Sequence, residues 1–109
     1  MQSACDTHVH FYDHRYPVAP TSTLRPSDAT PADYRTAQIA MGTERIVVVQ
    51  PTTYGLDNSC QLDAMATFGD AARGVMVIDP TARREDLARL TDLGVRGARF
   101  HMLPGGAVP

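Results

Sequence analysis

The sequence lacks the features that mark several large classes of protein. It has no tryptophan and only two cysteines, Cys5 and Cys60, which are too few for a disulfide framework. No apolar run approaches the ~20 residues of a membrane span. The N-terminus has neither the basic start nor the apolar stretch of a secretory signal. These absences predict a cytoplasmic protein with reduced thiols.

A large excess of one charge is missing as well. The 109 residues include 10 basic and 12 acidic side chains, for a formal net charge of −2. The basic residues are scattered, so there is no electrostatic reason to expect nucleic acid or an anionic membrane as a partner. A chain with 43% hydrophobic and 20% charged residues is typical of a globular protein. Its length fits one domain, residues 1–109.

Four short segments have the pattern of strands: 4–10, 45–50, 74–78 and 95–101. The second and third are unbroken apolar runs, which are typical of strands buried on both faces. In the fourth segment, strict alternation would put four residues on one face: Val95, Gly97, Arg99 and His101.

Three helices are predicted between these strands by their end signals. Thr30-Pro31-Ala32-Asp33 is typical of an N-cap followed by proline and by an acid that bonds back to the cap, and Gly42 would end this helix. Its apolar spacing puts Tyr34, Ala37 and Met41 on one face. Asn58-Ser59-Cys60-Gln61 is interpreted as a second start of the same kind, closed by Gly69. The third helix would run from about Arg84 to Gly94.

The resulting alternation of strands and helices predicts an α/β fold with parallel strands. A (β/α)₈ barrel takes about 250 residues, so four such units are about half of one. A small, open, doubly wound sheet is the alternative. The long connection from Phe11 to Thr30 follows the carboxyl end of the first strand, where α/β proteins build their sites.

The strongest candidate site is Asp6-Thr7-His8-Val9-His10. Residues two apart on a strand point the same way, so His8 and His10 should project together at the strand end. Paired imidazoles can bind a metal ion or hydrogen-bond a substrate oxygen. Two incidental polar residues at a strand end are the plainer interpretation.

Two further groups of residues are candidates for substrate binding. Arg99, near the end of the fourth strand, could pair with a substrate carboxylate, and a salt bridge to Asp6 or Asp79 is the alternative. After the second strand, an amide, a hydroxyl and a phenol could orient a polar ligand, or they could simply belong to a turn: Gln50, Thr52 and Tyr54.

Four segments together resemble one family. They are 5–11 (CDTHVHF), 47–58 (VVVQPTTYGLDN), 72–80 (ARGVMVIDP) and 94–100 (GVRGARF). They are similar to the amidohydrolase-related (β/α)₈-barrel hydrolases, in their lactonase-like branch. The resemblance covers essentially the whole chain and implies the N-terminal half of such a barrel, strands one to four.

The resemblance implies that His8 and His10 polarise a lactone carbonyl, that Arg99 anchors a substrate carboxylate and that Thr52 hydrogen-bonds the ligand. In this branch no metal is required, and water is activated by an aspartate near the end of the eighth strand, which the chain does not contain. In the wider superfamily the His-x-His pair binds a divalent metal such as zinc. A metal-dependent hydrolase or decarboxylase is therefore an alternative, with His8 and His10 as ligands.

Three departures from the pattern of the pyrone dicarboxylate lactonases bear on the substrate. His101 replaces an asparagine, Gly105 stands where a second carboxylate-binding arginine is usual, and Leu24 matches a substrate-contacting tyrosine. They favour a monoacid or sugar-acid lactone, and His101 raises the option of a metal site of three imidazoles with His8 and His10.

The leading hypothesis is thus an enzyme that hydrolyses a small carboxylated lactone. The competing hypothesis is a catalytically inactive half-barrel or small binding module, since half of the site walls would be absent from 109 residues. Association of two half-barrels into a homo-oligomer could close the sheet.

Overall fold

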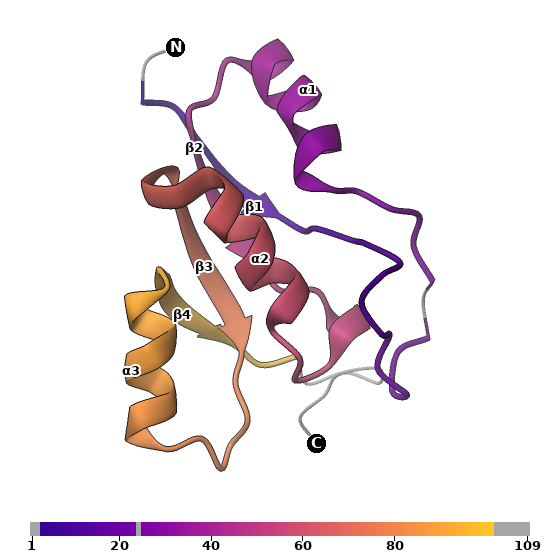
Figure 1. Ribbon diagram of the computed structural model, residues 1–109, viewed down its shortest axis with the longest axis vertical. Coiled ribbons are helices and arrows are strands. Elements are labelled where there is room, and N and C mark those ends of the chain that lie inside the picture. The colour runs from indigo at the N-terminus through magenta and orange to yellow at the C-terminus, as the bar shows by residue number, and fades with distance from the viewer. Residues whose placement is uncertain (1–2, 24, 102–109) are drawn as a thin grey trace.

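The computed structural model describes residues 3–23 and 25–101, and its centre is a four-stranded parallel sheet (Figure 1). The strands are β1 (Cys5–Val9), β2 (Arg45–Val49), β3 (Ala72–Val77) and β4 (Val95–Arg99). The helices between them are α1 (Pro31–Met41), α2 (Ser59–Phe68) and α3 (Arg84–Asp92). Short 3₁₀ turns occupy Thr52–Tyr54 and Gly69–Ala71. The predicted alternation is confirmed, with boundaries shifted by up to two residues.

The strand order distinguishes between the two α/β folds that the sequence allowed. The strands lie in the order β1-β2-β3-β4, so no point exists at which the order reverses. A doubly wound sheet has such a reversal, whereas a barrel adds each strand beside the last. In Figure 1, α2 lies across one face of the sheet and α3 lies beside β4. The described chain therefore has the topology of a barrel segment.

One hydrophobic core fills the space between the sheet and the helices. The strands contribute Val9, Ile46, Val48, Ala72, Met76 and Val95, and the helices contribute Cys60, Ala64, Met65, Phe68 and Leu90. α2 packs on β2 and β3, while α3 packs on β4. All four strands therefore contribute to a core on the helix-covered face of the sheet, and the side chains of the opposite face are not part of this core.

Two β-bulges set which side chains reach that opposite face. In β1, Asp6 pairs with Ile46 but Val9 pairs with Val48, so β1 has one residue more than β2 over this stretch. In β4 the same offset falls between Val95 and Gly97, which pair with consecutive residues of β3. A bulge bends a strand and re-aims its side chains.

The β4 bulge makes one sequence prediction wrong. Val95 belongs to the core under the helices, whereas a Cβ at Gly97 would meet the side chain of Val75, which is outside that core. Val95 and Gly97 therefore do not share a face. Strict alternation failed because the extra residue at Arg96 reverses the facing of all that follows.

Both helices end where the sequence predicted, α1 at Gly42 and α2 at Gly69, but only α1 begins with the predicted side-chain cap. Thr30 and Asp33 form the predicted capping box, and Gly42 ends α1 with φ at 74°. At α2, Asn58 makes no side-chain cap, and Asp57 accepts the hydrogen bond of the Ser59 N–H instead. Asn58 Nδ2 instead donates to the carbonyl oxygen of Val77 at 3.0 Å, so a tertiary contact overrides the local capping preference.

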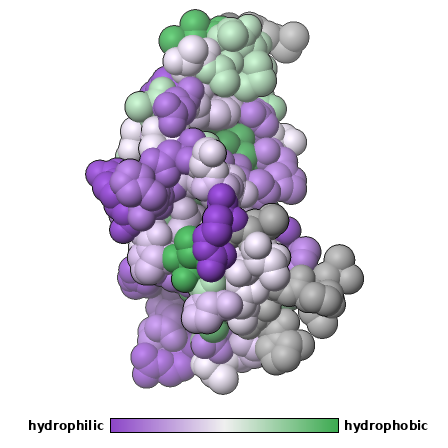
Figure 2. Space-filling model, turned by 90° about the vertical axis from the view of Figure 1, so that its right-hand side faces the viewer, coloured by the Kyte–Doolittle hydropathy of each residue, from purple (hydrophilic) through white to green (hydrophobic). Residues whose placement is uncertain are grey.

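The buried face of α1 also differs from the predicted one. Tyr34 packs edge-on against Phe11, but the next inward residue is Gln38 rather than Ala37 or Met41. Met41 is 52% exposed. Figure 2 shows hydrophobic surface at the upper end of the molecule, where Figure 1 places α1. The rotation of α1 about its own axis is fixed by Tyr34, whose hydroxyl donates to Asp6. The spacing of apolar residues on so short a helix could not predict this rotation.

Side chains hold the long segment that follows β1. The amide of Gln61, which is fully buried on α2, accepts from Phe11 N at 3.0 Å and donates to Phe11 O at 2.7 Å. The Tyr54 hydroxyl accepts from Asp13 N and donates to Asp13 O. These side chains make the hydrogen bonds that a neighbouring strand would otherwise make with the backbone of Phe11 and Asp13. The chain is therefore held in one direction past the end of β1.

Both cysteines are free, as expected. None of the helices in residues 3–23 and 25–101 combines the length and apolar character that crossing a bilayer requires.

Gln61→Leu should destabilise the fold by about 2–4 kcal/mol, because it leaves the buried Phe11 N–H without a partner and its C=O with only the weak thiol donor of Cys60. Urea unfolding followed by circular dichroism measures this free energy. The control Thr67→Val alters an exposed residue of the same helix and should stay within about 0.5 kcal/mol of the wild type. Equal stability of the two variants would contradict the structural role of Gln61.

Candidate functional site

His8 and His10 lie side by side at the carboxyl end of β1. Their ring centroids are 4.9 Å apart, with the planes nearly perpendicular. Asp6, which strict alternation would put beside them, instead accepts a hydrogen bond from the hydroxyl of Tyr34 on α1 at 2.8 Å. The β1 bulge separates Asp6 from His8 in this way, so the acidic and imidazole side chains face different layers.

The two imidazoles are held differently. His10 Nδ1 lies 2.6 Å from the carbonyl oxygen of Val49, the last residue of β2. A carbonyl can only accept, so Nδ1 carries the proton and the neutral ring has a lone pair on Nε2. His8 is exposed, and its ring contact with His10 is its principal side-chain interaction.

The surroundings of His10 favour its neutral form. Burial lowers the pKa of His10 below 6.5, the hydrogen bond to Val49 partly opposes this, and electrostatic interactions with His8 and Arg99 lower it further. Neutral His10 can accept a hydrogen bond or bind a cation through Nε2, whereas donation from Nε2 requires protonation. In this pair, the ring of His10 is held by a hydrogen bond to the backbone, whereas the ring of His8 is exposed and contacts His10.

Arg99, the last residue of β4, reaches back across the sheet to the end of β2. Its Nη1 donates to the carbonyl oxygen of Gln50 at 2.7 Å. Within the described chain it forms no ion pair, and the acids considered as partners are bonded elsewhere, Asp6 to Tyr34 and Asp79 to Thr81. Its guanidinium therefore keeps donors that could pair with an anionic ligand.

The residues predicted after β2 divide into buried and accessible ones. The Gln50 amide is fully buried and bonded to protein groups, as is the Tyr54 hydroxyl, which contacts the backbone of Asp13. Thr52 is half-buried at the start of the 3₁₀ turn. His101 is half-buried just beyond β4. Of these four side chains, those of Gln50 and Tyr54 are therefore committed to internal hydrogen bonds, whereas those of Thr52 and His101 are half-buried.

Tyr12 is a neighbour of the site that the sequence interpretation missed. Its ring centroid lies 6.2 Å from that of His10 and 6.5 Å from that of Tyr54. Burial raises its pKa, and the charge of Arg99 acts in the opposite direction, which places both Tyr12 and His10 in the field of that cation. The signal in the sequence was the spacing His8, His10, Tyr12, which continues the i, i+2 pattern past the strand end.

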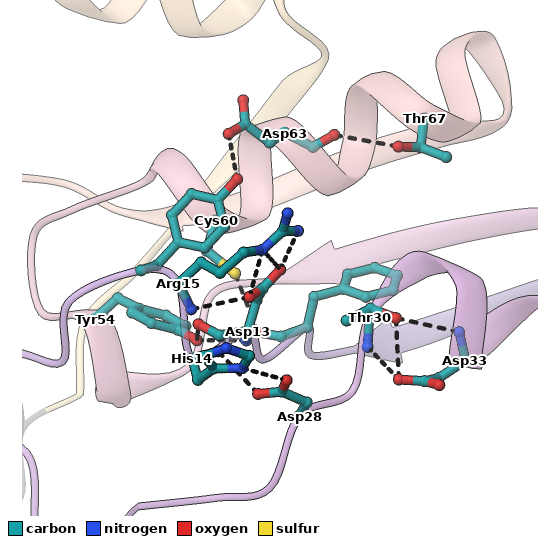
Figure 3. Close-up of polar contacts among 12 residues, drawn as sticks. Asp13, His14, Arg15, Asp28, Thr30, Asp33, Tyr54, Cys60, Asp63 and Thr67 are labelled. Carbon is teal, nitrogen blue, oxygen red and sulfur yellow. Dashed lines mark hydrogen bonds and ion pairs between the residues drawn. The ribbon is translucent and has the colours of Figure 1, made fainter.

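A third histidine joins an acidic cluster away from this pair, in the segment after β1 (Figure 3). His14 Nδ1 lies 2.6 Å from an oxygen of Asp28, and Asp13 is bonded to Arg15. The hydrogen bonds and charge of Arg15 lower the pKa of Asp13 to about 2. Asp13 is thus paired with Arg15, and the contacts of this cluster tie the segment after β1 together.

The described residues do not assemble the three-imidazole metal site. In 3–23 and 25–101, only Asp13, His14 and Asp28 bring three potential ligand atoms within 4.8 Å of one another. His101 does not complete a group of that kind with His8 and His10. Two imidazoles are fewer than the three protein ligands usual in catalytic zinc sites, so this part of the chain alone does not provide a complete metal site. The departures at Leu24 and Gly105 lie outside the described residues.

We expect His10 to titrate below pH 6.5 in NMR, because burial disfavours its charged ring. In Arg99→Gln its pKa should rise but stay below 6.5, since burial is the larger cause. In the wild type, unfolding restores the ordinary pKa of His10, so the unfolded chain binds this proton more readily than the folded one. The free energy of unfolding should therefore decrease as the pH falls below 6.5 towards the folded-state pKa. His10→Gln should lack this contribution to the pH dependence of stability. A wild-type midpoint at or above 6.5 would contradict the assignment.

Comparison with known proteins gives a consistent result. A D-galactarolactone isomerase from Agrobacterium fabrum (strain C58 / ATCC 33970) is 38% identical over 98% of this chain. A 2-pyrone-4,6-dicarboxylate hydrolase from Comamonas testosteroni is 36% identical over 92% of it. The matched regions make up 37% and 33% of those proteins, so the chain spans about a third of their length.

A solved structure agrees with the topology. The apo crystal structure of Agrobacterium tumefaciens ATU3138 superposes with a TM-score of 0.91 at 38% identity, over 99% of this chain and 40% of that one. Four parallel strands in sequential order that match 40% of a larger chain are the half-barrel that the sequence predicted. The family model described as amidohydrolase matches residues 5–109. The chain therefore belongs to the amidohydrolase family, as an N-terminal part of its (β/α)₈ barrel.

Proposed function

We propose that this chain supplies half of the active site of an enzyme that hydrolyses a small carboxylated lactone. The observation that carries the proposal is the juxtaposition, at one edge of the sheet, of two imidazoles and an arginine that pairs with no carboxylate among residues 3–23 and 25–101. The carboxyl ends of barrel strands are where such enzymes place their catalytic groups. Similarity to a lactone isomerase and a pyrone dicarboxylate hydrolase supports the substrate class.

Arg99 is the proposed anchor for the substrate carboxylate. One of its N–H groups is bonded to Gln50 O, and a guanidinium has five such groups, so a bidentate pair with a carboxylate remains available. The bond to Gln50 also restricts the side chain before the ligand arrives, which reduces the entropy lost on binding. Thr52 and His101 are the proposed additional ligand contacts.

The two histidines have different proposed roles. His8 is free to donate a hydrogen bond to the lactone carbonyl, where negative charge develops as water attacks. Neutral His10 accepts through Nε2 and so orients the water or a hydroxyl of the substrate. This division of labour modifies the expectation that both rings polarise the carbonyl, because His10 has already committed its only proton when neutral. The carboxylate that activates water would come from the half of the barrel beyond this chain.

A metal-dependent hydrolase or decarboxylase is the alternative that one observation favours. The lone pair on Nε2 of His10 is the form in which imidazole binds a metal, and His8 lies beside it. His8 and His10 would then be two ligands and residues beyond the described chain would supply the others. The 109 residues alone would be inactive under either reaction, because the opposite wall of the site is missing.

The test is turnover of a panel of lactones by the full-length polypeptide, with the 109-residue chain assayed beside it. The panel includes pyrone, muconate-type and sugar-acid lactones, each with and without a chelator. We expect chelator-resistant turnover, a loss of roughly 10²–10³ in kcat for His8→Ala, and a higher KM for Arg99→Ala with a carboxylated lactone.

Arg96→Ala is the matched control for Arg99→Ala. It removes an arginine of the same strand whose guanidinium donates to the backbone carbonyls of Thr91 and Val95, and it should leave KM unchanged. Turnover that a chelator abolishes and zinc restores would favour the metal-dependent alternative. A full-length protein that turns over none of these lactones would overturn the proposed function.

A further inference from the structure

The side chain of Gln50 uses its whole hydrogen-bonding capacity in the interior. Nε2 donates to the carbonyl oxygens of Gly55 at 2.9 Å and Asp57 at 3.1 Å. Oε1 accepts from Asn58 Nδ2 at 2.6 Å and from Val77 N at 2.9 Å. An amide has two donor hydrogens and two acceptor lone pairs, so all four are satisfied, and the side chain is fully buried.

These bonds continue the sheet where β2 itself has ended. β2 and β3 pair up to Val49 and Val75, and Gln50 N then donates to Val75 O. Beyond this point the β2 backbone turns away. Val77 N is taken up by the Gln50 amide and Val77 O by Asn58, so the two side chains replace the missing strand at the last residue of β3.

The same residues hold the two side chains of the proposed site. Val77 pairs with Arg99 across β3 and β4, and the Arg99 guanidinium returns to Gln50 O, which closes a ring of contacts. The preceding carbonyl, Val49 O, fixes His10 Nδ1. Two consecutive carbonyls therefore hold side chains from β1 and from β4. The positions of these two carbonyls depend on the backbone turn that follows β2, and the Gln50 amide makes hydrogen bonds to that turn at Gly55 and Asp57.

We propose that Gln50, assisted by Asn58, is a positioning residue that aims His10 and Arg99 at the same ligand by fixing the carbonyls of Val49 and Gln50. It touches no substrate. Without its amide the 52–58 turn keeps only the Asn58–Val77 bond as a side-chain attachment to β3, and both carbonyls gain freedom to move. The tautomer of His10 and the orientation of Arg99 are then no longer set in advance. The significance for catalysis rests on the proposed function, but the positioning itself does not.

The experiment measures the His10 ring directly in the 109-residue chain. ¹⁵N NMR distinguishes the Nδ1–H tautomer from the Nε2–H tautomer, and the exchange rate of the Nδ1 proton reports its hydrogen bond. In Gln50→Leu we expect the Nδ1–H signature to be lost or mixed, with proton exchange roughly tenfold faster. Asn58→Ala removes only one of the two cooperating amides and should shift the same signals less.

Met65→Ala is the control for general loosening. Met65 is a buried residue of α2 whose side chain lies against Gly74 and Gly94, so its truncation creates a cavity and destabilises the fold without removing a hydrogen bond of the turn after β2. Its His10 signals should match the wild type. Loss of the Nδ1–H signature in Met65→Ala as well would overturn the proposal, since any destabilisation would then suffice.

An unchanged His10 tautomer and exchange rate in a folded Gln50→Leu would also overturn it. If Gln50→Leu does not fold, Asn58→Ala decides, and wild-type signals in that variant count against the proposal. None of these measurements uses a lactone. Absence of turnover would therefore contradict the proposed function and leave the positioning role of Gln50 standing.

Discussion

The backbone at the carboxyl edge of this sheet leaves its strands while still buried, and its polar groups must be paired there. Unpaired, each would cost on the order of 1–3 kcal/mol. Gln61 pairs both backbone groups of Phe11 after β1, and Gln50 with Asn58 pairs both groups of Val77 at the end of β3. The rest of the site depends on these side-chain amides, which take the place of a neighbouring strand. They hold the backbone in one conformation where the strands end, and that backbone in turn holds His10 and Arg99.

The electrostatics of the site follow from the same supports. Arg99 and His10 are held by adjacent carbonyls, so a permanent cation lies near an imidazole. The cation and burial both favour the neutral ring. A carboxylated ligand bound to Arg99 would neutralise that cation and thereby weaken its effect on His10. Ligand charge and the protonation of the histidine are therefore coupled, even though no acidic side chain of the described chain pairs with Arg99.

Much of this architecture could be predicted from the sequence because its signals are local. The apolar runs of β2 and β3 and the Thr30–Asp33 capping box are patterns of a few adjacent residues, and the structure contains them. Their alternation with helices was enough to indicate parallel strands, and the resemblance supplied the barrel.

The errors arose where a distant contact decides. Asn58 looked like a helix cap, but its amide is drawn to Val77, nineteen residues on. Gln50 was predicted to bind a ligand, yet the structure buries it among backbone groups that no local pattern identifies. Tyr12 went unnoticed because its importance lies in its distance from His10, not in its neighbours along the chain. The roles of His8, Arg99 and Thr52 remain predictions.

The bulge in β1 has a consequence for how charge is distributed through the molecule. A single additional residue changes the parity of a strand, so two positions an even number apart lie on opposite sides of the sheet when that residue falls between them. Asp6 and His10 are separated by an even number of positions and yet lie in different layers, with the acid sealed against Tyr34. The sheet therefore separates the carboxyl group of Asp6 from Arg99, the cation with which it could otherwise form an ion pair. One inserted residue thus preserves the positive character of the face that a negatively charged molecule would approach.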